Sequence, residues 1–175
     1  MRLFTAIDLS DEVRANIESL QDKFNPIGPI QWSPASNLHI TTKFIGEWPQ
    51  DRLEELKAAL DRIPPVGFID IEVRGIGWYP NSHAARVLCA GVHASQALYD
   101  LAKATDAAAA ALGVPVEQRV YSPHLTLARI RNSQPSAPLP QEFGRFAAAR
   151  YHLYLSEPSS GGSRYSKLAD FSLIP

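Results

Sequence analysis

The sequence predicts an α+β fold of two lobes related by a pseudo-twofold axis, each a largely antiparallel sheet with helices outside. Short β-type runs alternate with amphipathic helical runs along the 175 residues. A strand that contains His-x-Thr occurs twice, with the histidine at position 39 and at position 124, and a helical run precedes each copy. Near the C terminus, a Ser/Gly turn joins two β-type runs as a hairpin. We therefore expect one bilobal domain over residues 1–175, with a cleft between the two sheets.

The first half of the chain is expected to contain two strands and two helices. A strand at 2–8 precedes a helix whose N-cap is Ser10, because a serine oxygen can accept a free N–H of the first turn. The apolar residues of this helix recur at helical spacing: Val13, Ile17, Leu20 and Phe24. A strand at 38–45 follows, and then a helix at 50–62, which Pro64 brings to an end.

The second half is expected to hold one helix and the remaining strands. The expected strands cover 67–76, 85–92, 122–130, 150–156 and 164–172. Between the second and third of these lies an alanine-rich helix at 95–112, with Ser95 as its N-cap. The polar, proline-rich stretch at 132–140 is expected to be an exposed loop.

Two tetrapeptides carry the candidate chemistry: His39-Ile40-Thr41-Thr42 and His124-Leu125-Thr126-Leu127. Side chains alternate between the faces of a strand, so the His and the Thr of each copy point the same way. Two such strands facing each other would present two imidazoles and two hydroxyls to one cleft. Two histidines can act as an acid–base pair near neutral pH, and hydroxyls can donate to the oxygens of an anion. The residues alone leave open that these are two ordinary strands with a polar face.

The other three histidines are expected to have no chemical role. His93 begins a third triplet, His93-Ala94-Ser95, but lies where a strand ends and the alanine-rich helix begins. Ser95 is then better explained as an N-cap than as a ligand group. His83 and His152 are expected to be surface or loop-edge residues.

The two motifs resemble the paired H-x-T-x signatures of the 2H phosphoesterase superfamily, and most closely its RNA 2′,3′-cyclic phosphodiesterase branch, the 2′-5′ RNA ligase-like proteins. The resemblance covers nearly the whole chain. It includes the segments 1–9, 39–47, 86–92 and 159–165. Thr42 stands where an aliphatic residue is usual and Cys89 where an aromatic is common, which puts substrate preference in doubt more than activity.

The resemblance implies hydrolysis of an RNA or nucleotide 2′,3′-cyclic phosphate to a 2′-phosphate, by His/His acid–base catalysis without metal or cofactor. The implied site consists of His39, His124, Thr41, Thr126, Arg129 and Phe44. His39 would protonate the leaving O3′ and His124 would activate water, although the near symmetry of the motifs allows the reverse. The two threonines would hold phosphate oxygens, Arg129 would bind phosphate and Phe44 would stack a base.

Strand geometry raises a difficulty for Phe44 and Arg129. Both lie five positions after a motif histidine, so strict alternation would turn them away from it. Only a β-bulge, or the end of the strand, would bring them to the same face. Without such an irregularity, Phe44 would be a core residue and Arg129 a solvated surface charge.

Composition limits the partners and the compartment that we expect. The net charge of −1 and the pI of about 6.5 show no basic excess, so RNA is expected to bind at its 3′ end or as a nucleotide rather than along a groove. One cysteine cannot form an internal disulfide, and neither a signal peptide nor a membrane span is evident. We therefore expect a cytoplasmic monomer that does not bind membranes. The lone cysteine, and the lack of a His pair at ligand spacing with a Glu, argue against zinc.

Two alternative functions remain open at this point. The same site could join RNA ends by 2′-5′ ligation if a ribose hydroxyl displaces water. The protein could also be a non-catalytic module that binds RNA ends or nucleotides. Turnover of a cyclic phosphate in the absence of metal separates these alternatives.

Overall fold

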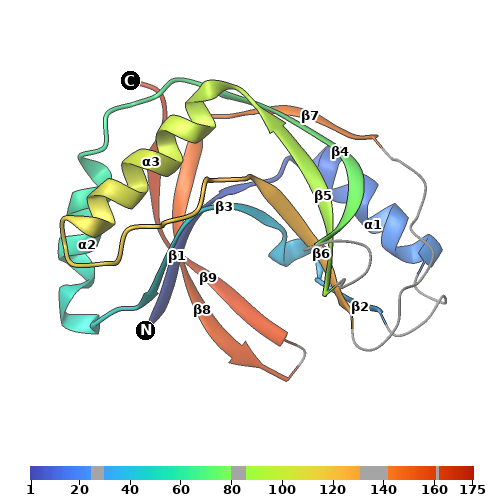
Figure 1. The fold of residues 1–175 in the computed structure, drawn as a ribbon, viewed down its shortest axis with the longest axis horizontal. Helices are drawn as coiled ribbons and strands as arrows, with labels where there is room; N and C mark the ends of the chain where they lie inside the picture. The colour runs from blue at the N-terminus through green and yellow to red at the C-terminus, as the bar shows by residue number, and fades with distance from the viewer. Residues whose placement is uncertain (25–29, 80–85, 131–141, 161) are drawn as a thin grey trace.

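The computed structural model describes residues 1–24, 30–79, 86–130, 142–160 and 162–175. It contains two antiparallel sheets, one of four strands and one of five, with the helices on their outer sides (Figure 1). This confirms the α+β class with two sheets. The stretch at 132–140, expected as a loop, lies outside the described residues.

The four-stranded sheet combines the two ends of the chain. Its order is β3-β1-β8-β9, where the strands are β1 (Arg2–Asp8), β3 (His39–Glu47), β8 (Arg150–Ser159) and β9 (Gly162–Ser172). The β8–β9 hairpin confirms the pairing that the Ser/Gly turn predicted. The first His-x-Thr motif therefore lies on an edge strand, next to the N-terminal strand.

The five-stranded sheet has the order β2-β6-β5-β4-β7. Its strands are β2 (Ile30–Trp32), β4 (Ile69–Tyr79), β5 (Val87–Ala94), β6 (His124–Ile130) and β7 (Glu142–Ala148). The sequence did not predict β2 or β7. β2 comes before β3 in the chain and yet pairs with β6, so the two sheets are not two contiguous halves of the sequence.

Each motif strand is reached through a helix. β1, α1 (Asp11–Phe24) and β3 make one strand–helix–strand unit, and β5, α3 (Gln96–Ala110) and β6 make another. In both units the motif strand pairs antiparallel with the strand that precedes the helix. This is the pseudo-twofold relation that the repeated motif suggested. The short helices η1 (Ala35–Asn37) and η2 (Gln50–Arg52) precede β3 and α2 (Leu53–Asp61).

The helix ends agree with the sequence in part. The Ser10 hydroxyl accepts a hydrogen bond from the Val13 N–H at 3.3 Å, as a capping serine should. Ser95 occupies the N-cap position of α3, but its side chain makes no capping hydrogen bond. The helix expected at 50–62 is divided into η2 and α2.

Buried apolar side chains from both sheets and all three α-helices form one cluster. α1 packs against β7, while α3 packs against both α2 and β3. α3 therefore connects the two sheets physically, because it follows a strand of one sheet and covers a strand of the other. No helix in the described part of the chain is long and apolar enough to cross a membrane.

Candidate active site

The two motif histidines have the same local geometry. Each is the first residue of its strand, β3 or β6. The His39 Nδ1 lies 2.7 Å from the Asn37 carbonyl oxygen, and the His124 Nδ1 lies 2.9 Å from the Ser122 carbonyl oxygen. A carbonyl oxygen can only accept, so Nδ1 donates in both rings. This fixes the tautomer of the neutral imidazole and leaves Nε2 available to exchange a proton with a substrate.

A β-bulge interrupts β3 directly after the motif threonine. Thr41 pairs with Ala6 of β1, but Lys43 pairs with Thr5, so Thr42 has no partner residue in the ladder. The Thr42 side chain is buried, and its hydroxyl hydrogen-bonds the Thr5 hydroxyl at 2.7 Å. Although related proteins usually have an aliphatic residue at this position, the hydroxyl of Thr42 has a hydrogen-bond partner inside the four-stranded sheet.

β6 contains the equivalent bulge. Thr126 pairs with Cys89 of β5 and Ala128 pairs with Leu88, which leaves Leu127 without a partner residue. In both motif strands the skipped residue is the third after the histidine. The pseudo-twofold relation therefore extends to an irregularity of the backbone.

The bulges bring Phe44 and Arg129 to the face of the motif histidines. Directly paired residues of antiparallel strands point to the same side, and Phe44 pairs with Phe4 as His39 pairs with Asp8. Arg129 likewise pairs with Val87, on the same face of β5 as the partner residues of His124 and Thr126. Both side chains are exposed, and that of Phe44 is 66% exposed. The difficulty of strict alternation is thereby removed.

His39 is enclosed by aromatic rings. Phe4 stacks on the imidazole with ring centroids 4.6 Å apart, and Tyr165 meets it edge-on at 5.1 Å. Burial lowers the pKa of His39 below its ordinary value, while the Asn37 carbonyl and the Asp8 carboxylate oppose that shift. In the free protein, His39 is therefore mainly neutral at neutral pH.

His124 lies in a more open environment. Its ring is exposed and runs parallel to the exposed ring of Tyr79, with centroids 6.4 Å apart. The two motifs have similar sequences, but the environments of their histidines differ: the His39 imidazole is partly desolvated, whereas the His124 imidazole faces solvent.

An ionic cluster lies next to His39 on the same face of the four-stranded sheet. The Asp8 carboxylate accepts hydrogen bonds from the Tyr154 hydroxyl and, at 2.9 Å, from Lys167 Nζ. Burial would raise the pKa of Asp8, but these bonds outweigh it and the pKa is lowered, which keeps the carboxylate charged. His152 Nε2 lies 3.4 Å from the same carboxylate.

His152 is a correction to the sequence prediction. It was expected at the surface or a loop edge, but it lies within β8 and is only 7% exposed. Burial lowers the pKa of its imidazole. Cys89 is partly exposed, and it pairs with Thr126 across β5 and β6.

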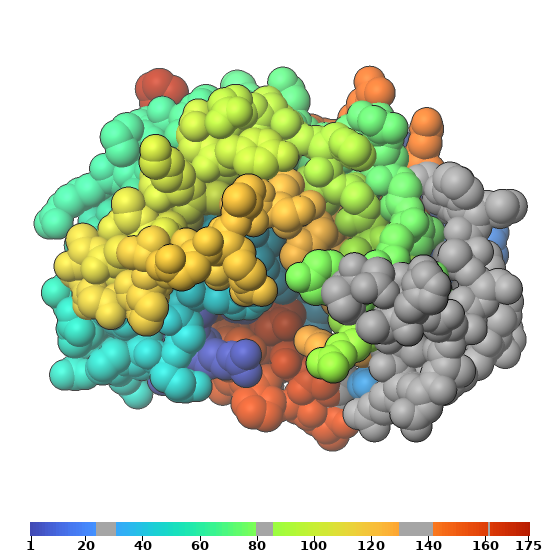
Figure 2. Space-filling model, viewed as in Figure 1, coloured from blue at the N-terminus to red at the C-terminus, as the bar shows by residue number. Residues whose placement is uncertain are grey.

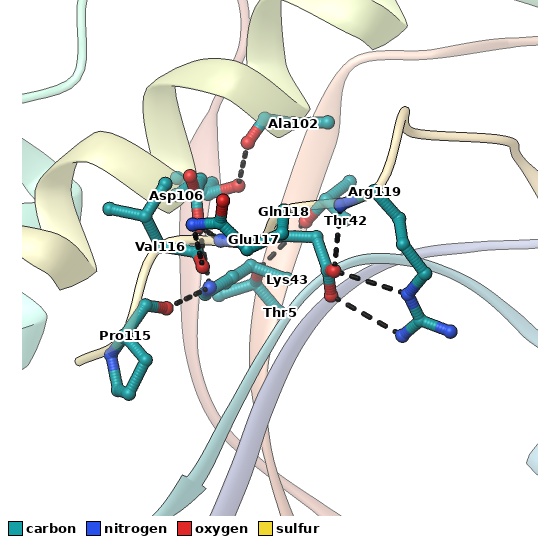
Figure 3. Close-up of polar contacts among 11 residues, drawn as sticks. Thr5, Thr42, Lys43, Ala102, Asp106, Pro115, Val116, Glu117, Gln118 and Arg119 are labelled. Atoms are coloured by element: carbon teal, nitrogen blue, oxygen red, sulfur yellow. Dashed lines mark hydrogen bonds and ion pairs between the residues drawn. The ribbon is translucent and has the colours of Figure 1, made fainter.

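Three contacts join the first motif strand to α3 and to the segment before β6. The Tyr121 hydroxyl donates to the Thr41 carbonyl at 2.8 Å. Lys43 Nζ pairs with Asp106 of α3 at 2.5 Å and donates to the Pro115 carbonyl at 2.9 Å (Figure 3). The sequence did not predict these contacts, because the two residues of each contact lie far apart in the chain.

A small cavity of about 100 Å³ borders His39, and Asp8, Arg14, Tyr154 and Tyr165 are among its lining residues. Figure 2 shows the surface hollowed between the segment that leads into β6, in orange, and the β8–β9 hairpin, in red. Within the described ranges, no three His, Cys, Asp or Glu side chains are grouped so that they could hold a metal ion.

Comparison with known proteins gives a consistent result. An RNA 2′,3′-cyclic phosphodiesterase of Methanocaldococcus jannaschii is 32% identical over 98% of this chain and 100% of its own length. A crystal structure of a Thermus thermophilus protein superposes with a TM-score of 0.89 at 31% identity, over 99% of this chain and 98% of that one. Escherichia coli LigT in complex with 3′-AMP gives a TM-score of 0.86 at 29% identity, with the same coverage.

The family model described as LigT like phosphoesterase matches residues 7–89 and 92–165. The match includes both His-x-Thr strands, β3 and β6, and the helices that precede them, α1 and α3. With this match, the paired motifs and the full-length likeness to LigT structures, the chain belongs to the LigT-like phosphoesterases of the 2H superfamily.

Proposed function

We propose that this protein hydrolyses the 2′,3′-cyclic phosphate at RNA 3′ ends, or on nucleotides, to a 2′-phosphate by metal-independent catalysis with His39 and His124. The observation that carries the proposal is the duplicated geometry of the two motif strands. On one face, each strand presents an imidazole anchored through Nδ1 and a threonine two residues later. The same face carries the side chain five residues after the histidine, which we call the +5 position: Phe44 in β3 and Arg129 in β6. The relatives named above as a cyclic phosphodiesterase and as a 3′-AMP complex support the choice of substrate class.

The reaction needs a proton to be removed on one side of phosphorus and supplied on the other. Water attacks phosphorus in line with the bond to the ribose O3′, which breaks and leaves the phosphate on O2′. His124 takes the proton of the water, and His39 gives one to O3′. General acid–base help is worth about 10²–10⁴-fold for each group. The Thr41 and Thr126 hydroxyls hold the non-bridging oxygens, where negative charge shifts during the reaction.

The decisive experiment is product analysis on a short RNA that ends in a 2′,3′-cyclic phosphate, with excess EDTA present. We expect complete conversion to the 2′-phosphate at an unchanged rate. Activity that disappears with EDTA and returns with a divalent ion would refute the metal-independent mechanism. A lengthened RNA would indicate 2′-5′ ligation, and tight binding without any product would indicate a non-catalytic module. We expect the active species to be a cytoplasmic monomer.

The exposed side chains at the +5 positions should divide the recognition of the substrate. Arg129→Ala should raise KM for every cyclic phosphate about equally, because a guanidinium pairs with phosphate oxygens and carries no base information. Phe44→Ala should cost about 1–3 kcal/mol on purine substrates, because stacking scales with ring overlap, and little on a cyclic phosphate of bare ribose. Steady-state constants on purine, pyrimidine and abasic substrates measure both effects.

Two exposed residues away from the motif strands serve as matched controls. Arg62→Ala removes an exposed arginine next to α2, and Phe68→Ala removes a phenylalanine that is 59% exposed. Neither change should alter any of the constants. Equal losses for Phe44→Ala on purine and abasic substrates would show that Phe44 acts in packing, and unchanged constants for Arg129→Ala would show that Arg129 only faces solvent.

A further inference from the structure

Three polar side chains form a row across the five-stranded sheet. His93 of β5 pairs with Glu72 of β4, which pairs with Arg145 of β7. The row lies on the same face as His124, because Gly91 pairs with His124 and His93 is two residues further along β5. The five-stranded sheet therefore continues the face of the candidate active site across three neighbouring strands (Figure 1).

The row borders a depression of about 630 Å³, within the usual range of ligand sites of about 300–1,000 Å³. We call it the β4–β5–β7 depression; its lining includes Asp70, Glu72, His93, Ser95, Arg145 and Phe146. The Ser95 hydroxyl oxygen is buried there, and no residue among those described hydrogen-bonds it.

A glycine separates His124 from the depression. Gly91 lies between them on β5, and a Cβ at this position would come within 2.6 Å of the Arg74 carbonyl oxygen. A glycine is therefore required for packing, and His93 Nε2 lies 3.7 Å from the place where its Cβ would stand, so the His93 imidazole lies over this position on the side of His124.

Charges in the depression favour a base over a phosphate. Arg145 donates through Nε and Nη2 to one oxygen of Glu72, at 3.1 and 2.7 Å, and Arg74 Nε lies 3.3 Å from the other oxygen. The Arg145 side chain is nevertheless 79% exposed, so Glu72 fixes a guanidinium plane that faces solvent. Guanidinium and imidazole planes are platforms on which unpaired RNA bases stack, and carboxylates such as Asp70 accept from base amino groups.

We propose that the β4–β5–β7 depression binds a base of the RNA chain upstream of the cyclic phosphate, so that the preferred substrate is an RNA end rather than a mononucleotide. The inference rests on the proposed function, which places the cyclic phosphate between the two motif histidines. A base stacked on His93 and Arg145 gives affinity with little net charge. This fits a protein whose net charge is −1.

The test compares an RNA hexamer with a mononucleotide in the double variant His93→Ala/Arg145→Ala. Binding of a labelled hexamer that ends in a 2′-phosphate is followed by fluorescence anisotropy, which needs no turnover. Turnover is measured on the 2′,3′-cyclic mononucleotide. We expect the hexamer Kd to rise about tenfold or more, as for the loss of a stacked base, while kcat/KM on the mononucleotide changes by less than about twofold. Arg62→Ala, which removes an exposed arginine outside the depression, should change neither constant.

Two outcomes would overturn the depression as a base site: a hexamer Kd equal to that of the wild type, or a parallel loss on the mononucleotide, which would mean that the row acts on His124 instead. Failure of the proposed function looks different. In that case the wild-type protein does not turn over the cyclic mononucleotide, while the anisotropy measurement still reports whether the double variant has lost affinity for the hexamer.

Discussion

Alanine at either motif histidine should lower kcat on a 2′,3′-cyclic phosphate at least about a hundredfold, because each imidazole supplies one of the two proton transfers. His39→Ala and His124→Ala should both stay folded, since neither ring contributes to the buried apolar cluster. The double variant should be little worse than the poorer single variant, because an acid and a base that act in one step are not additive. Steady-state kinetics with circular dichroism as a check on folding decide the matter.

Asparagine variants sharpen this test. His39→Asn and His124→Asn keep a side-chain N–H near the Asn37 or Ser122 carbonyl but remove the atom that exchanges the proton. They should be as inactive as the alanine variants. Near-normal turnover in any folded single variant would rule out the two-histidine mechanism.

The pH profile identifies which of the two motif histidines is the acid, because burial lowers the pKa of His39. An acid must carry its proton, so if His39 is the acid, kcat/KM falls as pH rises through this lowered pKa and the optimum lies on the acid side of neutrality. A base must be unprotonated, so if His39 is the base, activity persists at neutral pH and is lost only as pH falls through the lowered pKa. The first profile is expected.

Local patterns predicted much of the fold. The helical spacing in α1, the alanine run in α3 and the turn between β8 and β9 each have a short-range cause, and each was placed correctly within a few residues. β7 was missed because Gly144 and a run of alanines carry little strand propensity. β2 was missed because three residues are too few to show a period.

The arrangement of the site depends on contacts that the sequence does not display. A bulge is a property of a strand pair. The change of face that brings Phe44 to the side of His39 is therefore visible only once the register of β3 against β1 is known. His152 was expected to be exposed, whereas it is buried in β8 between β1 and β9, which come from the two ends of the chain. The +5 aromatic and arginine were identified only through the family resemblance, and their roles stay predictions.

The largest expected effect on stability is at the pair formed by Lys43 and Asp106. The Lys43 side chain is 7% exposed and that of Asp106 22%, so the pair is largely shielded from water (Figure 3). Removing one partner of such a pair leaves a buried charge without compensation and costs about 3–5 kcal/mol. We expect Asp106→Ala to lie near about 3 kcal/mol, because the Pro115 carbonyl still accepts from Lys43. Chemical denaturation measures the loss.

An exposed pair on α2 provides the control. Lys57 and Glu54 lie 2.8 Å apart, with Glu54 82% exposed, so Glu54→Ala should cost no more than about 0.5 kcal/mol. A similar loss for both variants would show that burial adds nothing at Lys43.

A second substitution separates the charge from the packing at the same place. Lys43→Met/Asp106→Leu removes both charges while keeping apolar volume, and replacing a buried pair in this way is often neutral or stabilising. The double variant should therefore recover most of the stability that Asp106→Ala loses.

The turnover of the double variant tests the role of the ion pair in the site. Lys43 lies between the bulge residue Thr42 and the exposed Phe44. Recovered stability with impaired turnover would therefore mean that the ion pair sets the position of the first motif strand against α3. Recovery of both properties would mean that apolar packing alone holds β3 in place, and a double variant as unstable as Asp106→Ala would contradict the assignment of the loss to an unpaired charge.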